Sequence, residues 1–324
     1  MGIDLTGLRA LSFASRVYKF NFRNTVTLGR HEIHFWKQEY DVVRENVGAA
    51  YDESIAVGAY CEPLLCKLGA ENITSIDASA FEGASLIHDF NRPIPQDLRG
   101  QFDTFLDFGS IEHIFNVAQV VDNIVNLVKP GGHVLIGTNA NGFPSHGLYQ
   151  FSPEFFYSLF SKRNGFEDTS VFLVNLSRPK MWSLIRRPVD LKRRNEIPFE
   201  DQMMMLILSK KAAGDIPLSV IQSDYDDTWA RFETGNWSAW NRDNISKWKK
   251  MLHGFVSPYA YRSIGYSFHS SRVRWKYRDD RILINPDTVD AEAFRGMMSN
   301  PAFAAPMRKG RWSGSAAPAP PRHT

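Results

Sequence analysis

The 324-residue sequence contains only two cysteines, Cys61 and Cys66, and this scarcity excludes several kinds of protein. Secreted domains held together by a disulfide framework carry many more cysteines. A zinc site of four cysteines is excluded by number alone. We expect two reduced thiols on a helix, which favours a cytoplasmic protein.

Long hydrophobic runs and a strong charge imbalance are also missing. No apolar stretch reaches the roughly 18 residues that a membrane-spanning helix needs, and the N-terminus lacks the features of a secretory signal. The formal net charge of +3 is too small to argue for a nucleic-acid partner. With 43% hydrophobic residues, the chain can bury the core of one large domain with appendages.

A regular alternation of apolar runs and chain breakers occupies residues 73–138. Apolar runs of strand length lie at residues 73–76, 84–87, 102–108 and 133–138. Before the last run, apolar residues at steps of three and four predict a helix over residues 114–128, which Pro130 and two glycines end. Strands separated by helices and breakers predict parallel crossover units. We therefore expect a Rossmann-like α/β fold, a doubly wound, mostly parallel sheet with helices on both faces.

The flanking residues complete the predicted organisation. Residues 25–30 read as the first strand, and Ser152 with Pro153 predicts the start of a helix. The apolar runs at residues 170–176 and 202–209 predict a terminal antiparallel strand pair.

These elements divide the chain into four predicted parts. Six of the eight tryptophans follow residue 215, among many Arg and Lys residues, and the last residues are rich in Pro, Ala, Gly and Ser. The predicted parts are a lead-in helix at 1–24, an α/β domain at 25–212, an accessory aromatic and basic segment at 213–308, and a disordered tail at 309–324.

Acidic and aromatic residues at the predicted strand ends are the first functional signal, because open α/β sheets bind ligands outside the carboxyl ends of their strands. Asp77 is placed to accept hydrogen bonds from ribose hydroxyls. Asp89 and Phe90 are placed to bond and stack on an adenine ring. The same acids could simply form turns. The full set is Asp77, Asp89, Phe90, Asp107, Phe108 and Gly109.

Two longer motifs resemble a known family. The stretch Phe-Asp-Thr-Phe-Leu-Asp-Phe-Gly-Ser-Ile-Glu-His-Ile at residues 102–114 is followed by Leu-Val-Lys-Pro-Gly-Gly-His-Val-Leu-Ile at 127–136. Together they resemble the fourth and fifth motifs of class I S-adenosylmethionine (SAM)-dependent methyltransferases. The resemblance implies SAM as the cofactor, with Asp77 at the ribose, Asp89 by the adenine and Asp107 near the methionine moiety.

The sequence departs from that family at the glycine-rich loop, which normally follows the first strand. One candidate for the cofactor loop is Gly29, but about 48 residues then separate it from Asp77, where roughly 20 are expected. The other candidate is Gly58, which has better spacing but a weaker strand before it. We slightly favour Gly58 and keep both as cofactor-binding candidates.

Glu112, His113 and His146 are the remaining site candidates. Glu112 is counted with the cofactor-binding residues, although it could be a first-turn acid favoured by a helix dipole. His113 and His146 are the catalytic candidates, as general bases toward an acceptor, although histidines at such positions also serve as packed wall residues. His31 and His34 could be two metal ligands, but no third ligand is apparent, so no metal site is predicted.

The sequence therefore predicts a SAM-dependent methyltransferase acting on an oxygen or nitrogen of a small-molecule or glycan acceptor. The glycan alternative comes from a loose similarity of residues 81–91 to methyltransferase-like proteins of bacterial polysaccharide clusters. The incomplete glycine loop leaves open a non-catalytic binding or scaffold protein with the same fold. A nicotinamide-dependent oxidoreductase is disfavoured, because it needs the fingerprint glycines that this chain lacks.

Overall fold

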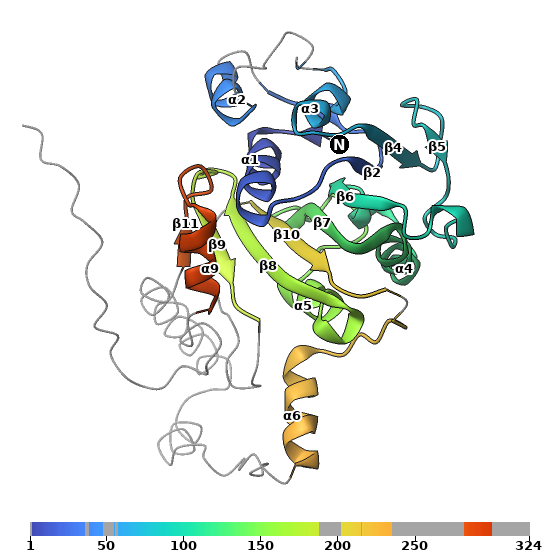
Figure 1. Cartoon of the computed structure of the whole chain (residues 1–324), viewed down its shortest axis with the longest axis vertical. Helices are drawn as coiled ribbons and strands as arrows, with labels where there is room; N and C mark the ends of the chain where they lie inside the picture. Colours follow the sequence, from blue (N-terminus) through green and yellow to red (C-terminus); the bar gives the residue numbers. More distant parts are fainter. Residues whose placement is uncertain are drawn as a thin grey trace, which may run out of the picture.

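A computed structural model describes residues 2–35, 39–47, 55, 58–187, 202–214, 216–234 and 282–299. Its centre is a sheet with the strand order β11-β9-β8-β10-β7-β6-β2-β4-β5 (Figure 1). The strands are β2 (Asn24–Leu28), β4 (Asn72–Asp77), β5 (Leu86–Ile87), β6 (Phe102–Phe108), β7 (Val128–Asn141), β8 (Phe166–Asn175), β9 (Trp182–Ile185), β10 (Met203–Lys211) and β11 (Ile282–Ile284).

One half of the sheet is parallel and the other half is antiparallel. Strands β7, β6, β2, β4 and β5 pair in parallel, which confirms the predicted crossover units and gives a Rossmann-like α/β fold. From β7 outward, β10, β8, β9 and β11 all pair antiparallel to their neighbours. The description "mostly parallel" is therefore wrong for the whole sheet.

The predicted antiparallel strand pair exists, but it is not terminal. β8 and β10 pair antiparallel as expected. However, β10 inserts between β7 and β8, and β9 and β11 extend the sheet beyond β8. The short apolar run of β9 lies close to β8 in the sequence, while the partner of β9 on its other side comes from about one hundred residues further along the chain.

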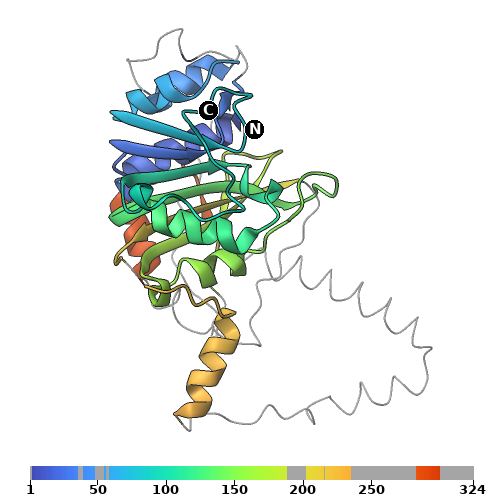
Figure 2. The same ribbon diagram turned by 90° about the vertical axis from the view of Figure 1, so that its right-hand side faces the viewer.

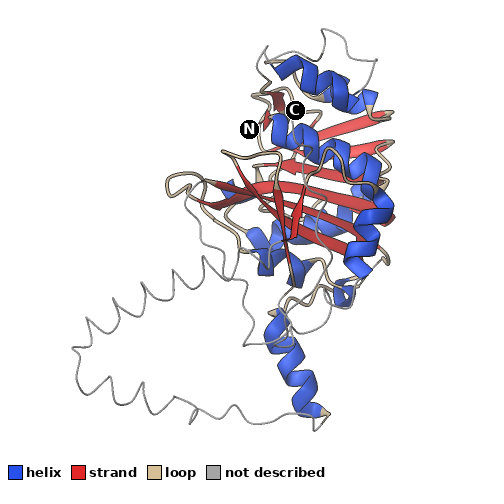
Figure 3. Cartoon of the chain, turned by 90° about the vertical axis from the view of Figure 1, so that its left-hand side faces the viewer, coloured by secondary structure: helices blue, strands red, loops and turns tan. Residues whose placement is uncertain are grey.

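Helices cover both faces of the sheet, as predicted (Figure 3). Successive strand residues point to opposite faces, so Phe105 of β6 packs with one apolar cluster while Leu106 and Phe108 pack with the other. Helices α1 (Leu5–Phe13), α3 (Glu62–Lys67) and α9 (Ala291–Ser299) contribute to the cluster around Phe108.

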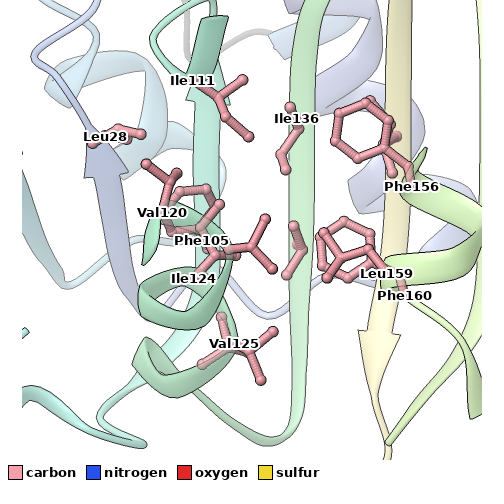
Figure 4. Close-up of a cluster of buried hydrophobic side chains, with 14 of the residues drawn as sticks. Leu28, Phe105, Ile111, Val120, Ile124, Val125, Ile136, Phe156, Leu159 and Phe160 are labelled. Atoms are coloured by element: carbon pink, nitrogen blue, oxygen red, sulfur yellow. The ribbon is translucent and has the colours of Figure 1, made fainter. Parts of the chain in front are cut away.

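The opposite face carries α4 (Val117–Leu127) and α5 (Pro153–Leu159). Figure 4 shows Val120 and Ile124 of α4 beside Phe105, and Phe156 of α5 further along the same face. Both helices begin at side-chain caps: the Asn116 side chain accepts a hydrogen bond from Gln119 N, and Ser152 Oγ accepts one from Phe155 N. The apolar spacing and the caps thus explain both helices.

The N-terminal helix and the end of the described chain belong to the same core, in contrast to the predicted separate parts. The buried Arg9 forms an ion pair with Asp287 at 3.1 Å. The rings of Phe13 and Phe294 meet edge-on at 5.4 Å. β11 and α9 therefore complete the α/β domain rather than forming an accessory segment. The predicted tail at 309–324 lies outside the described residues.

Helix α6 (Ser223–Glu233) runs away from the sheet (Figure 2). An Arg163–Asp226 ion pair and a hydrogen bond from Ser223 N to Glu154 Oε1 hold its first turn to the domain. No helix within the described residues is long and apolar enough to cross a bilayer.

The long segment between β2 and β4 is an insertion whose described part includes secondary structure. It contains β3 (Glu32–Ile33), which pairs with β1 (Gly2–Ile3), then α2 (Tyr40–Val47) and α3. Cys61 lies buried just before α3, Cys66 lies exposed on it, and both thiols are free, as predicted.

Candidate active site

The sheet changes its direction of growth between β2 and β6. The chain passes from β2 to β4 and β5 on one side, then crosses to β6 and β7 on the other side of β2. Open α/β sheets bind ligands outside the carboxyl ends of the strands at such a switch point. The topology therefore selects the segments that follow β2, β4 and β6 as the candidate site.

Gly29 occupies the centre of this switch point. It follows β2 with φ +78°, and its N–H donates to the carbonyl of Ile76 in β4 at 2.7 Å. A Cβ at Gly29 would lie 3.1 Å from Ser110 Oγ and 3.9 Å from Asp77 Oδ2. A glycine here leaves the strand ends open and allows the left-handed turn.

Gly58 lies elsewhere. Its N–H donates to the carbonyl of Ile33, and a Cβ at Gly58 would meet no atom within 4 Å. Gly29, not Gly58, lies beside the ends of β4 and β6, so the preference for Gly58, which rested on spacing to Asp77, is not supported. The reason is the insertion, which lengthens the chain between β2 and β4 without displacing their ends.

Asp77 is half-buried at the end of β4, and its two carboxylate oxygens have different surroundings. Its Oδ1 accepts the N–H of Ser79 at 2.9 Å, as a turn-forming acid does, while Oδ2 faces Gly29. Its partner in the neighbouring strand is Ile87, which is 49% exposed. The loop after Asp77 carries Phe81, which is 91% exposed. Two exposed apolar side chains thus accompany this carboxylate.

Asp89 and Phe90 differ from the sequence expectation. Asp89 Oδ1 accepts hydrogen bonds from the backbone and side chain of Asn91, and these bonds hold the pKa of Asp89 below its usual value. The Phe90 ring is buried in the core with Ile94. Because Phe90 packs inward, it offers no ring for stacking on a ligand, and that predicted role is wrong.

Asp107 supports the backbone at the end of β6. It is fully buried, and its two carboxylate oxygens accept the N–H groups of Ser110 and Ile111 at 2.8 and 3.1 Å. The Ser110 hydroxyl in turn donates to the carbonyl of Leu28 at 2.6 Å. Asp107 therefore holds the loop after β6, and Ser110 ties that loop to the end of β2. The predicted place of Asp107 near the methionine moiety stays a prediction.

Phe108 and Gly109 shape the same turn. Phe108 is buried, and Cβ atoms at Gly7 and Gly137 would lie 3.3 and 3.0 Å from its ring. Gly109 has φ +93°, so the chain turns sharply there. Gly109 therefore lies at the turn after β6 and stays a cofactor-binding candidate, whereas the Phe108 ring packs into the core and offers no surface to a ligand.

Glu112 is a second buried acid next to Asp107. It is 1% exposed, and the Thr138 hydroxyl donates to its Oε2 at 2.9 Å. Burial first, and then the negative charge of Glu112, raise the pKa of Asp107 to about 7.

His113 and His146 come together although 33 positions separate them. Their ring centroids lie 4.9 Å apart, and both side chains are exposed. The loop that carries His146 is held by Leu148 N and Tyr149 N, which donate to the carbonyl of Glu112 at 2.7 and 3.2 Å. The structure therefore unites the two predicted catalytic histidines beside Glu112.

His31, for which no metal site was predicted, is buried beside Phe108. It is 1% exposed, its ring meets Phe108 edge-on at 5.7 Å, and neither ring nitrogen has a partner among the described residues. Burial lowers the pKa of His31 to about 3. His34, in contrast, is exposed beside Glu32.

Sequence reasoning missed Ser110, Thr138, Ile87 and Phe81. Ser110 and Thr138 act through partners that are 82 and 26 residues away. The exposure of Ile87 and Phe81 could not be predicted from the sequence, because apolar residues in or near a strand are usually buried.

No protein-family model and no curated protein matches the chain. Several solved structures are similar to it in fold. The citrinin polyketide synthase CMeT domain is 12% identical with a TM-score of 0.33, and the match covers 59% of this chain and 46% of that one. A Burkholderia thailandensis 1,6-didemethyltoxoflavin-N1-methyltransferase, solved with 1,6-didemethyltoxoflavin and S-adenosylhomocysteine, is 12% identical with a TM-score of 0.36, covering 64% and 79%.

A SAM-dependent methyltransferase from Thermotoga maritima is 15% identical with a TM-score of 0.35, and the match covers 64% of this chain and 91% of that one. The chain thus spans less than half of the polyketide synthase chain and most of the other two. At these TM-scores the likeness carries no argument about activity, and the fold rests on the strand order given above.

Proposed function

We propose that this protein binds SAM and transfers its methyl group to an oxygen or nitrogen of a small-molecule acceptor. The observation that carries the proposal is the convergence of Gly29, Asp77 and Ser110 at the switch point of the parallel sheet. A carboxylate at the end of the strand next to a glycine turn is the arrangement that binds a ribose in such folds.

The residues at this edge fit an adenosyl group. Asp77 Oδ2 faces the open side of Gly29 and can accept a ribose hydroxyl. Ile87 lies in register with Asp77 and is half exposed, so it offers apolar surface to a base. Phe81 replaces the buried Phe90 as the ring that is free to stack.

The histidine pair supplies the acid–base chemistry. Bound SAM would supply an electrophilic methyl group on a positively charged sulfur. The acceptor atom would lose a proton on methylation. His113 and His146 are exposed at the strand end next to the switch point and are placed to accept that proton as general bases.

The surroundings of the histidine pair indicate an acceptor with a ring. Phe115 is 75% exposed and Leu148 is 60% exposed, and the Tyr149 hydroxyl donates to the Phe115 carbonyl at 2.7 Å. Apolar and aromatic surface next to proton-accepting groups suits aromatic acceptors, and it also suits the apolar face of a sugar, as in a glycan. We propose this class of acceptor on that surface.

Calorimetry with S-adenosylhomocysteine tests the cofactor. We expect binding by the unaltered protein and a loss of at least about 100-fold in affinity for Asp77→Ala, because a charge-assisted hydrogen-bond pair to the ribose is removed. Asp97→Ala is the matched control, since Asp97 lies on a short helical turn (Gln96–Leu98) outside the site.

Absence of heat and of a thermal shift at millimolar ligand would overturn the proposal and favour the non-catalytic binding protein. Equal affinities of the Asp77→Ala and Asp97→Ala variants would refute the ribose assignment. Methyl transfer to a panel of phenols, heterocyclic amines and sugars then distinguishes acceptor classes.

A further inference from the structure

Three side chains with metal-binding atoms meet at the carboxyl ends of β6 and β7. One ligand atom each from Glu112, His113 and His146 lies within 4.8 Å of the other two. Two imidazoles and one carboxylate are the protein ligands of many catalytic zinc sites and of non-haem iron sites. We propose that Glu112, His113 and His146 bind a divalent transition-metal ion, whose remaining coordination positions face solvent.

The spacing is close to that of a formed site. With bonds of about 2.0–2.1 Å, ligand atoms around a tetrahedral zinc ion lie about 3.3 Å apart. The two histidines are exposed, so rotations about their side-chain bonds can shorten the remaining distance without disturbing the core. Nitrogen ligands also disfavour magnesium and calcium, which prefer oxygen.

Glu112 is held ready for an ion. It is buried, and the Thr138 hydroxyl fixes one of its carboxylate oxygens at 2.9 Å. Such outer hydrogen bonds orient the metal-binding carboxylates of proteins. A buried carboxylate next to a second acid is costly, and a bound cation offsets that cost.

The loop that carries His146 is fixed onto Glu112. Gly147 has φ +77°, and a Cβ there would lie 3.0 Å from Glu112 Cγ. Leu148 N and Tyr149 N both donate to the Glu112 carbonyl. His146 is therefore positioned by the backbone of the residue that supplies the carboxylate, which explains how distant parts of the chain form one site.

The ion would act on the acceptor. An acceptor hydroxyl bound to the metal loses its proton more readily, because the cation lowers its pKa; the proton then leaves to water rather than to a histidine. This role rests on the proposed methyl transfer, whereas binding of the ion does not.

Titration of the chelator-treated protein with ZnCl2 alone tests the site. We expect one ion per chain with a micromolar or lower Kd, and a visible absorption band on Co²⁺ binding that reports histidine ligation. His113→Ala and His146→Ala should each weaken Zn²⁺ binding by more than roughly 100-fold, and Thr138→Val by about 10–100-fold. His34→Ala removes an exposed histidine outside the cluster and should change nothing.

A millimolar Kd for the unaltered protein overturns the proposal, and so do equal affinities of the His113, His146 and His34 variants. Because the two histidines are exposed, we expect their variants to stay folded. Circular dichroism of each variant checks this expectation. Zn²⁺ binding without S-adenosylhomocysteine binding would support the metal site and refute the proposed function. Binding of S-adenosylhomocysteine without binding of Zn²⁺ would refute the metal site and leave the proposed function standing.

Discussion

The acids at the two sides of the switch point are held in different ways. On the β4–β5 side, Asp77 and Asp89 bond to backbone N–H groups two residues later and remain accessible. On the β6–β7 side, Asp107 and Glu112 are buried, and Glu112 bonds to Thr138. The accessible acids can bind a ligand, whereas Asp107 fixes the loop that presents Glu112 and the histidines.

This comparison predicts that one side tolerates substitution and the other does not. A turn acid near solvent is replaced at little cost, since water takes over its hydrogen bonds. A buried acid that satisfies two backbone N–H groups leaves both without partners when it is removed. Stability measurements therefore separate the two sides without any ligand.

The largest effect is expected for Asp107→Ala. Removing the carboxylate leaves the buried N–H groups of Ser110 and Ile111 without acceptors, which should cost about 3 kcal/mol of the free energy of unfolding. Urea denaturation measures this value. A loss below about 1 kcal/mol would show that the loop after β6 does not depend on Asp107.

Acid should weaken the contribution of the buried histidines to stability. The pKa of His31 is lowered to about 3, and that of His133 to about 4, both mainly by burial. Below pH 6.5 the unfolded chain binds a proton at each position and the folded chain does not, so these two histidines lower the stability as the pH falls. Asp107 acts in the opposite direction, because its pKa is raised to about 7 and the folded chain binds that proton first. From pH 6.5 to 5, His31 alone should account for about 2 kcal/mol.

His31→Gln should remove that share of the pH dependence. Urea midpoints at several pH values, for the variant and the unaltered protein, measure it. Parallel pH curves for the unaltered protein and His31→Gln would contradict the prediction.

Gly147→Ala should destabilise more than Gly131→Ala. Both glycines have φ near +80°, but a Cβ at position 147 would press on Glu112 at 3.0 Å, whereas one at position 131 meets nothing within 4 Å. The backbone strain is the same in both variants and cancels in the comparison. The remaining difference, about 1–2 kcal/mol in the free energy of unfolding, comes from the contact with Glu112. Thermal unfolding of the two variants gives the difference, and equal losses would argue against a fixed His146 loop.

The smallest effect is expected for Asp89→Ala. Asp89 is partly exposed, and its bonds to Asn91 are local, so the loss of stability should be much smaller than that for Asp107→Ala. Urea denaturation alongside Asp107→Ala tests the contrast between the two sides directly. A loss of stability comparable to that of Asp107→Ala would show that the two sides do not differ in their tolerance of substitution.

Much of the fold was predictable from local pattern. The β6 run at 102–108 was located to the residue, and the helix that ends before Pro130 is α4. The start of β7 was missed, because β7 begins at Val128 and runs through Pro130, Gly131 and Gly132, with a register irregularity opposite β6. Glycine and proline punctuate local structure, but pairing with a neighbouring strand overrides them.

The site was predictable in part. Asp77 follows from its place at a strand end, and His113 from its place in a motif. The contrast between Phe90, which is buried, and Phe81, which is exposed, was not predictable, because both are phenylalanines near short strands. Nor was the meeting of His113 with His146, which depends on Gly147 packing against Glu112.

The sequence by itself determined the parallel crossover units and the acids at their strand ends, because helix and strand periodicity and turn chemistry act over a few residues. Only the tertiary structure decided which of those acids face solvent, how the first and last described elements share one core, and that a carboxylate and two histidines form one cluster. These features depend on burial and on contacts between residues tens to hundreds of positions apart, which no local pattern records.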